Sequence, residues 1–300
     1  MINQPSALSR FQKKLSWQDV ELSKVFPLLK ISVSEDIDNN GDITSKICQV
    51  KDSGVAVLIA REEMVICGLP LIPLIIQEFQ LKSIHVENIK VDGDRVKKNE
   101  IFAYLRGQQK DILLVERTIL NFIQRLSGIS TLTKQYSTIL DKYEVGLLDT
   151  RKTTPGHRIL EKYATSCGGG YNHRMNLSDR ILIKDNHLAS HSIDSKINFS
   201  RLMKKIVQKA GKDMVEVEID QINHLVPAIE ANVAAVLLDN FTPEEVRKAV
   251  EINKNRVVLE ASGGINLKSL EYFAKTKPHF ISTGAPIHSS RWIDIGLDWK

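Results

Sequence analysis

The sequence has few cysteines, no long apolar run and no concentrated stretch of basic residues. Cys48, Cys67 and Cys167 are odd in number and widely spaced, without a Cys-x-x-Cys pair. This spacing argues against a disulfide framework or a zinc ribbon and favours a reducing compartment. The longest apolar stretch, residues 69–76, contains two prolines and is too short to span a bilayer. Residues 1–14 are polar and lack the apolar core of a signal peptide, so we expect a cytoplasmic protein with no membrane association.

A basic surface of the kind that binds nucleic acid is also lacking. The formal charge of +5 over 300 residues is a mild excess, and the pairs Lys97-Lys98 and Lys204-Lys205 stand in polar surroundings. Short pairs of this kind are typical of a solvated face, so we expect no nucleic-acid partner. The hydrophobic fraction of 42% and charged fraction of 26% are those of an ordinary globular protein of one large or two modest domains.

The first part of the chain reads as an α+β segment. The sequence predicts a short amphipathic helix at Val20–Lys30, a strand at Val55–Arg61, a helix at Leu71–Gln80, a hairpin turn at Asp92-Gly93-Asp94 between residues 89–91 and 101–105, and a long helix from Asp111 to Lys142, broken near Ser127-Gly128. These pieces carry no catalytic pattern of their own.

From Val145 onward, short apolar runs end in polar residues or glycine. The runs are at residues 146–149, 181–184, 214–218, 235–239, 257–260 and 280–284. Most are separated by stretches long enough for a helix, which favours a parallel sheet of βαβ units. Their number and spacing favour a (β/α) barrel over an open sheet.

Charged and polar residues follow these predicted strands where active sites of such barrels gather. Lys184, Glu218, Asp239 and Ser262 all stand at strand ends. A single Asp after a strand is usually a helix N-cap, but lysine cannot accept a backbone N–H. We therefore expect these side chains to converge on one site.

The densest cationic segment contains Arg151 and Lys152, and it precedes Gly168-Gly169-Gly170 and Arg174. Arginine binds carboxylate or phosphate through two parallel hydrogen bonds, and lysine acts as a point charge. With Lys184, these residues suit a substrate of several negative charges. The alternative interpretation is that these cations form surface salt bridges. The three glycines argue against it, because they permit close approach of the backbone to a ligand.

Two further features suggest phosphate and metal binding. The loops at residues 260–264 and 283–285 follow the last two predicted strands, where barrels commonly cradle phosphate. Glu218 and Asp239 end neighbouring strands, and carboxylates in a phosphate site usually hold Mg²⁺. Alternatively, they pair with Arg151 or Lys184.

Two other patterns carry less weight. His187 and His191 have the i, i+4 spacing of a zinc site, but a third ligand is not evident in the sequence. Cys167 precedes the three glycines, yet no base is arranged beside it, so we interpret it as a packed thiol rather than a nucleophile.

At these residues the chain resembles the quinolinate phosphoribosyltransferases. The matching blocks, in chain order, are Glu35-Asp36, residues 41–45, Glu116-Arg117-Thr118, Leu120-Asn121, residues 126–129, 149–153, 168–170, 172–174, 183–187, 216–218, 238–241, 260–265 and Gly284-Ala285. They cover nearly the whole chain.

The resemblance implies the conversion of quinolinate and 5-phosphoribosyl 1-pyrophosphate (PRPP) into nicotinate mononucleotide, pyrophosphate and CO₂, with Mg²⁺, on the route to NAD. It implies an α/β protein with an incomplete (β/α) barrel and an N-terminal α+β open-sandwich domain. By this resemblance, residues 1–128 form the sandwich, residues 129–287 form the barrel, and residues 288–300 form a tail that returns to the first domain.

The resemblance also implies residue roles, with Lys152, Glu218 and Asp239 catalytic. Quinolinate would be bound by Arg117, Thr150, Arg151, Lys152, His173, Arg174 and Lys184. PRPP would be bound by Glu218, Asp239, Ser262, Gly263, Gly264, Thr283, Gly284 and Ala285. Glu218 and Asp239 would hold Mg²⁺, directly or through water. Arg117 would reach the neighbouring active site of a homodimer, and assembly beyond the dimer is left open.

The sequence departs from this family pattern at His157, Asp179-Arg180, the long segment 190–200 and Pro286-Ile287. The closest alternative is a paralogue of the same fold that uses another substrate, such as the molybdenum-transport-associated relative. A second alternative is a non-catalytic protein that binds phosphate ligands or nucleic acid. The set of Arg117, Arg151, Arg174 and Lys184 favours a dicarboxylate.

Overall fold

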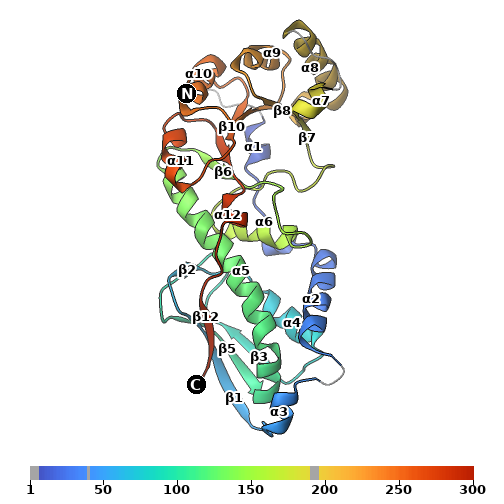
Figure 1. Ribbon diagram of the computed structural model, residues 1–300, viewed down its shortest axis with the longest axis vertical. Helices are drawn as coiled ribbons and strands as arrows, with labels where there is room; N and C mark the ends of the chain where they lie inside the picture. Colours follow the sequence, from blue (N-terminus) through green and yellow to red (C-terminus); the bar gives the residue numbers. More distant parts are fainter. Residues whose placement is uncertain (1–6, 39–40, 190–195) are drawn as a thin grey trace. The chain divides into compact units, whose positions relative to one another are not determined.

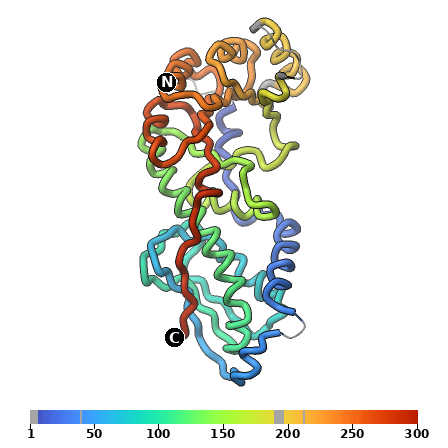
Figure 2. The backbone as a smooth tube through the Cα atoms, viewed as in Figure 1, coloured from blue at the N-terminus to red at the C-terminus, as the bar shows by residue number. Residues whose placement is uncertain are grey.

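The computed structural model describes residues 7–38, 41–189 and 196–300, which form two compact units (Figures 1 and 2). The first unit contains residues 1–14, 135–152 and 170–285, and the second contains residues 15–134, 153–169 and 286–300. The domain boundaries expected after residues 128 and 287 stay predictions. Most of the segment expected to be long, residues 190–195 with His191, lies outside the described residues.

A six-stranded parallel sheet forms the centre of the first unit. Its strands, in spatial order, are β6 (Gly146–Leu148), β11 (Phe280–Ser282), β10 (Val258–Ser262), β9 (Ala235–Asp239), β8 (Val215–Ile219) and β7 (Ile181–Ile183). All six predicted strands are therefore present and share one sheet. The strands are largely buried, as parallel strands covered on both faces should be. The order ends at β6 and β7, which confirms the incomplete (β/α) barrel.

Helices connect these strands. They are α7 (Asp185–Ala189), α8 (Lys196–Ala210), α9 (Leu225–Glu230), α10 (Pro243–Asn253) and α11 (Leu267–Ala274). The start of α10 follows from its sequence, because the Thr242 hydroxyl accepts from the Glu245 N–H and the Glu245 carboxylate accepts from the Thr242 N–H. Pro243 follows at the first helical position, where its missing N–H costs nothing.

The short helix α1 (Leu8–Phe11) belongs to the same unit. Phe11 is buried in a core cluster with Leu148, Ala235 and Phe280, and the two phenylalanine rings lie 5.9 Å apart. Phe280 begins β11, and Ala235 begins β9. Phe11 therefore packs at the amino-terminal end of the sheet, opposite the end at which active-site side chains were predicted.

A four-stranded antiparallel sheet forms the second unit together with helices. Its order is β12 (Ile295–Trp299), β1 (Ser53–Ala60), β5 (Ile101–Gln108) and β3 (His85–Asn88). The helices are α2 (Leu22–Asp36), α3 (Ile43–Ile47), α4 (Leu71–Glu78) and α6 (Arg158–Cys167), with most of α5 (Gln109–Asp141), and α12 (Ala285–His288) leads into it. Figure 1 shows β12 beside β1, so the end of the chain pairs with a strand from its first quarter. This unit confirms the expected α+β segment.

The hairpin expected around Asp92-Gly93-Asp94 is wrong in its pairing. β3 ends at Asn88 and pairs with β5, while β4 (Arg95–Val96) after the turn pairs with β2 (Met64–Val65). The Asp92 carboxylate explains the difference, because it accepts hydrogen bonds from the Gly68 and Leu69 N–H groups. The turn is held to a distant loop rather than closing a hairpin.

The break expected near Ser127-Gly128 is also wrong, since α5 runs without interruption from Gln109 to Asp141. Gly128 is instead a point of close approach, where an added Cβ would lie 2.0 Å from the Arg291 carbonyl oxygen. Figure 2 shows the red C-terminal segment running along α5. Despite its length, α5 contains many charged residues, and no helix within the described residues is both long and apolar enough to cross a bilayer.

We predict that Gly128→Ala destabilises the protein although alanine is the better helix former. The helix propensity gain is about 1 kcal/mol, whereas displacing a packed backbone segment costs about 1–3 kcal/mol or more. Urea unfolding should show a lowered midpoint. Thr138→Ala, at an exposed position of the same helix, should not lower it. Equal stability of Gly128→Ala and wild type would contradict the close packing of residue 291.

Candidate active site

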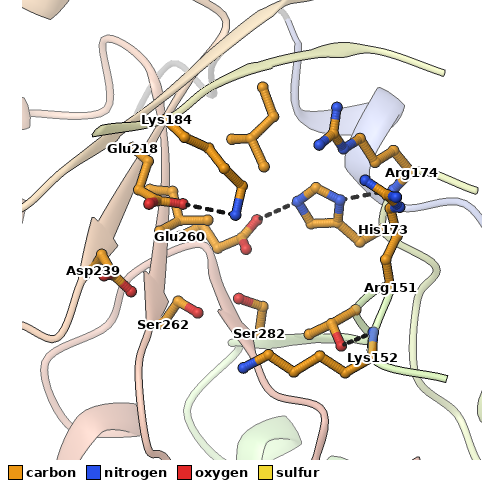
Figure 3. A pocket seen from close by; sticks show the side chains of 13 residues that line it. Arg151, Lys152, His173, Arg174, Lys184, Glu218, Asp239, Glu260, Ser262 and Ser282 are labelled. Carbon is orange, nitrogen blue, oxygen red and sulfur yellow. Dashed lines mark hydrogen bonds and ion pairs between the residues drawn. The ribbon is translucent and has the colours of Figure 1, made fainter. Parts of the chain in front are cut away.

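One cavity of the first unit gathers most of the side chains predicted to carry the chemistry (Figure 3). Its volume is about 360 Å³. It is lined by Thr150, Arg151, Lys152, His173, Arg174, Leu182, Lys184, Glu218, Leu237, Asp239, Glu260, Ser262 and Ser282. Several of these stand at the carboxyl ends of the parallel strands, so the structure brings Lys184, Glu218, Asp239 and Ser262 together as the pattern predicted.

Four cationic side chains line different parts of this cavity (Figure 3). Arg151 and Lys152 follow β6, Arg174 lies in the segment before β7, and Lys184 follows β7. Arg174 is buried, and both its burial and the neighbouring Arg151 lower its pKa. A buried arginine beside a second arginine favours a bound anion, which a carboxylate would supply.

Asp149 fixes the segment that carries His173 and Arg174. It is buried at the end of β6, where one carboxylate oxygen accepts from the Asn172 side-chain amide at 2.8 Å and the other from the His173 N–H at 2.8 Å. The Asp149 N–H donates to the Tyr171 carbonyl at 3.0 Å. One aspartate therefore holds two consecutive residues of the site in place.

His173 lies between two buried glutamates. Its Nε2 is 3.3 Å from Glu216 Oε2 and 3.5 Å from Glu260 Oε2, and its Nδ1 accepts from the Arg174 N–H at 2.7 Å. The ring therefore carries its proton on Nε2, facing the carboxylates. All three side chains are buried, and their ligating atoms lie within 4.8 Å of one another.

The carboxylate oxygens of Glu216 and Glu260 lie within 4.8 Å of each other, so ionising both glutamates is energetically unfavourable. Burial, followed by repulsion from Glu216, raises the pKa of Glu260 to about 8. Against burial, His173 and then Arg180 keep the pKa of Glu216 below its usual value. Arg180 is itself buried, with its guanidinium 4.2 Å from the centre of the Phe11 ring. At neutral pH we therefore expect Glu260 to be protonated and Glu216 to be ionised.

Glu218 and Asp239 form the acidic part of the cavity. Glu218 lies 3.6 Å from the Lys184 ammonium, so the ion pair predicted as an alternative is present. Burial raises the pKa of both carboxyl groups, and Lys184 opposes the rise in each. These are hard oxygen donors beside a cation, a set that suits either a lysine or Mg²⁺ with a bound phosphate.

The glycine loops follow β10 and β11 in the same sheet. Gly263 has φ +106° and Gly264 has φ +60°, backbone conformations that favour glycine. The Thr283 hydroxyl donates to the Ile265 carbonyl at 2.8 Å and accepts from the Ala285 N–H at 3.2 Å, so Thr283 ties the two loops. Only Ser262 of the predicted phosphate residues lines the cavity; Gly263, Gly264, Thr283, Gly284 and Ala285 do not. Their phosphate role stays a prediction.

Other predicted residues lie elsewhere. Arg117 is exposed on the part of α5 that belongs to the second unit, and within the described residues it has no ion pair and does not line the cavity. His187 Nδ1 accepts from the Lys184 N–H at 3.0 Å, which gives it a local structural role. Cys167, interpreted as a packed thiol, lies close to Cys67 and Asp92.

Two family models match this chain almost end to end. Residues 42–127 match the N-terminal domain of quinolinate phosphoribosyl transferase, and residues 129–298 match its C-terminal domain. The chain belongs to the quinolinate phosphoribosyltransferase family.

Relatives within the family are similar over most of their length. A probable nicotinate-nucleotide pyrophosphorylase (carboxylating) of Bacillus subtilis is 41% identical over 88% of this chain and 89% of its own. The chloroplastic enzyme of that name from Arabidopsis thaliana is 33% identical over 90% and 81%. The solved nicotinate-nucleotide pyrophosphorylase of Francisella tularensis superposes with a TM-score of 0.86 at 38% identity, covering 94% and 98% of the two chains.

Sequence reasoning missed the buried charges beneath the site. Glu216 and Glu218 are two residues apart on β8, and Glu260 and Ser262 are two apart on β10, so each pair shares a strand face. This alternation is visible in the sequence and is enough to add Glu216 and Glu260 to the predicted site. Arg180 was noted only as a departure from the family pattern. The sequence contains no sign that its side chain is buried.

We predict that Glu260→Gln changes the pH dependence of stability. A folded pKa of about 8 exceeds the usual 4.5, so between these values the unfolded chain releases a proton that the folded chain retains. This carboxyl therefore lowers wild-type stability as pH rises from about 4.5 to about 8, by at most about 1.4 kcal/mol per pH unit. Glutamine resembles the protonated acid and should remove that slope.

Urea unfolding at pH 5 and pH 8 measures the effect. The stability of Glu260→Gln relative to wild type should increase toward pH 8. Glu244→Gln, at an exposed position, should show the same offset at both pH values. Parallel pH profiles for wild type and Glu260→Gln would contradict the protonated state of Glu260.

Proposed function

We propose that this chain transfers the phosphoribosyl group of PRPP to quinolinate, with decarboxylation, giving nicotinate mononucleotide, pyrophosphate and CO₂. The observation that supports this best is a single cavity lined by the cations of Arg151, Lys152, Arg174 and Lys184 together with the carboxylates of Glu218 and Asp239. A pyridine dicarboxylate needs the cations, and ribosyl transfer needs the carboxylates. Family membership supports the same reaction.

The cationic part of the cavity would bind quinolinate. Arg151, Arg174 and Lys184 would hold its two carboxylates, with Thr150 and His173 beside them. Arginine contributes bidentate geometry, which fixes the plane of each carboxylate. Leu182 and Leu237 supply apolar surface in the same cavity, against which a flat pyridine ring would pack.

The acidic part would bind the ribose and pyrophosphate of PRPP. Glu218 and Asp239 offer the hard oxygen donors that Mg²⁺ prefers, and burial raises the pKa of both although Lys184 opposes the rise in each and Lys152 also opposes it at Asp239. The residues therefore fit the metal, held directly or through water. When bound, Mg²⁺ would neutralise charge on the departing pyrophosphate. Ser262, Gly263, Gly264, Thr283, Gly284 and Ala285 would bind the 5-phosphate.

The chemistry assigned to the protein is mainly positioning and electrostatics. As the C1–O bond to pyrophosphate breaks, the ribose ring gains positive charge, which Glu218 and Asp239 stabilise. The pyridine nitrogen then bonds to C1, and its positive charge makes the neighbouring carboxylate easier to lose as CO₂. The ring carbon that loses CO₂ keeps the electron pair and takes up a proton from solvent. Lys152 would lie between the two substrates. Holding both in register is worth up to about 7–11 kcal/mol.

The proposal is tested by incubating the purified protein with quinolinate, PRPP and Mg²⁺ and measuring nicotinate mononucleotide and CO₂. We expect both products in equal amounts, and neither without PRPP. Turnover of another aromatic acid but not quinolinate would favour the paralogue. Binding of PRPP without any product would favour the non-catalytic alternative.

We predict that Arg174→Ala raises the KM for quinolinate strongly, by about ten-fold or more, and changes the KM for PRPP little. The loss is that of a charge-assisted, bidentate contact, which is about twice as strong as a neutral one. Steady-state kinetics with each substrate varied in turn measure the two constants. Arg247→Ala, at an exposed position of α10, should change neither. Equal weakening of both substrates would remove Arg174 from the quinolinate site.

We further propose that the enzyme works as a homodimer in which Arg117 completes the partner's site. Arg117 is exposed, lines no part of the cavity and has no ion pair within the described residues, so its charge is available to another subunit. A two-fold axis would give each site the same arginine. The alternative is a solvated arginine contributing about 0–1 kcal/mol to a surface pair. The cytoplasmic location stays a prediction.

Mixing two inactive variants tests the shared site. If Arg117→Ala and Lys152→Ala subunits exchange at random in equal amounts, about half of the dimers are mixed, and each has one intact site of two. About a quarter of wild-type activity should therefore return. Native mass spectrometry verifies the exchange. A mixture that stays inactive after exchange would show that Arg117 serves its own subunit or none.

A further inference from the structure

A second cluster of chemically reactive side chains lies within the second unit, apart from the cavity described above. Cys67, Asp92 and Cys167 each present one ligand atom, and these three atoms lie within 4.8 Å of one another. Cys67 is fully buried, Cys167 is the last residue of α6, and Asp92 lies in the turn before β4. Three separate parts of the chain thus deliver two thiols and a carboxylate to one point.

The carboxylate of Asp92 is held firmly in this position. Its Oδ2 accepts from the Gly68 N–H at 2.8 Å and from the Tyr163 hydroxyl at 2.9 Å, and its Oδ1 accepts from the Leu69 N–H at 3.0 Å. A carboxylate oxygen has two acceptor positions, so Oδ1 keeps one. Within the described residues no lysine, arginine or histidine forms an ion pair with Asp92. Burial raises the pKa of its carboxyl group.

The thiol of Cys167 is held nearby by packing. Gly168, directly after it, has no room for a side chain, because a Cβ there would lie 2.4 Å from the Ser130 carbonyl oxygen. Gly93, beside Asp92, would bring a Cβ to 3.6 Å from the Cys167 carbonyl oxygen. The end of α6 is therefore close-packed against Ser130 and within ordinary contact range of Gly93, and Cys167 remains partly exposed to solvent.

The composition of the cluster distinguishes between two uses of such a pair. A disulfide needs only the two thiols, whereas the Asp92 carboxylate beside them adds an oxygen ligand and a negative charge. That charge would stabilise a cation. A divalent ion neutralises the carboxylate and the thiolates together, and metal ions deprotonate coordinating thiols outright.

We propose that Cys67, Cys167 and Asp92 bind a thiophilic divalent cation of the Zn²⁺ class. Binding forms two metal–sulfur bonds and one metal–oxygen bond, and the two thiol protons pass to solvent. Around tetrahedral zinc, ligand atoms are about 3.5–3.8 Å apart, so the cluster needs little more than about 1 Å of closure. Water, entering beside Cys167, takes the fourth position. Two sulfur ligands exclude Mg²⁺ and Ca²⁺, which prefer oxygen.

Titration of the reduced protein with Co²⁺ tests the proposal, because cobalt–thiolate bonds absorb in the near ultraviolet and carboxylate or histidine sites do not. We expect about one equivalent of Co²⁺ to give this band and Zn²⁺ to displace it. Zn²⁺ should also raise the Tm, since it binds only the folded site. Cys48→Ser, at an exposed position outside the cluster, should behave as wild type.

The variant that decides is Cys167→Ser, which replaces a partly exposed thiol and should leave the far-ultraviolet circular dichroism unchanged. It should lose the band and bind Zn²⁺ at least ten-fold more weakly. Cys67→Ser should do the same if it folds. An absent band in the reduced wild type, unchanged binding in Cys167→Ser, or loss of both thiols to a disulfide in preference to metal binding would each overturn the proposal.

Discussion

The concentration of like charge in one cavity is the constraint on which the rest of the first unit depends. Arg151, Lys152, Arg174 and Lys184 line the same small space, in which Arg174 is buried while Lys152 and Lys184 are exposed. In the absence of substrate, negative charges of the protein must offset the repulsion among these four cations. Glu218 pairs with Lys184, and Glu216, held ionised by His173 and Arg180, places a negative charge below them. The barrel interior is therefore polar where an aliphatic core would be usual.

The periodicity of the sequence predicts most of the fold and many residues of the candidate site. Strands buried on both faces are recognisable as apolar runs, and a parallel sheet places their carboxyl ends together, which is why Lys184, Glu218, Asp239 and Ser262 converge. The predictions that were wrong concern contacts between residues far apart in the sequence. Gly128 is predicted to break α5, but in the structure it allows the Arg291 carbonyl to pack closely against the helix. No local sequence pattern indicates that Cys67 and Cys167 lie close together.

The loops after β9 and β10 illustrate how closely the site is assembled. Gly263 lies against Asn240, where an added Cβ would meet the Asn240 side-chain oxygen at 2.3 Å and its backbone nitrogen at 2.7 Å. The Asn240 N–H donates to the Ser262 carbonyl at 2.9 Å. The segments that follow Asp239 and Ser262 are therefore packed against each other and joined by a backbone hydrogen bond. The proposed ribose site and the proposed phosphate site are linked through these two segments.

The pairing of β12 with β1 has a consequence for synthesis of the chain. β1 cannot complete its sheet until Ile295–Trp299 have been synthesised, because these residues cover its outer hydrogen-bonding edge. Until then the edge is an open template to which a strand of another molecule can add. A truncated product that lacks Ile295–Trp299 would therefore be prone to aggregation, a more severe outcome than the loss of five residues suggests.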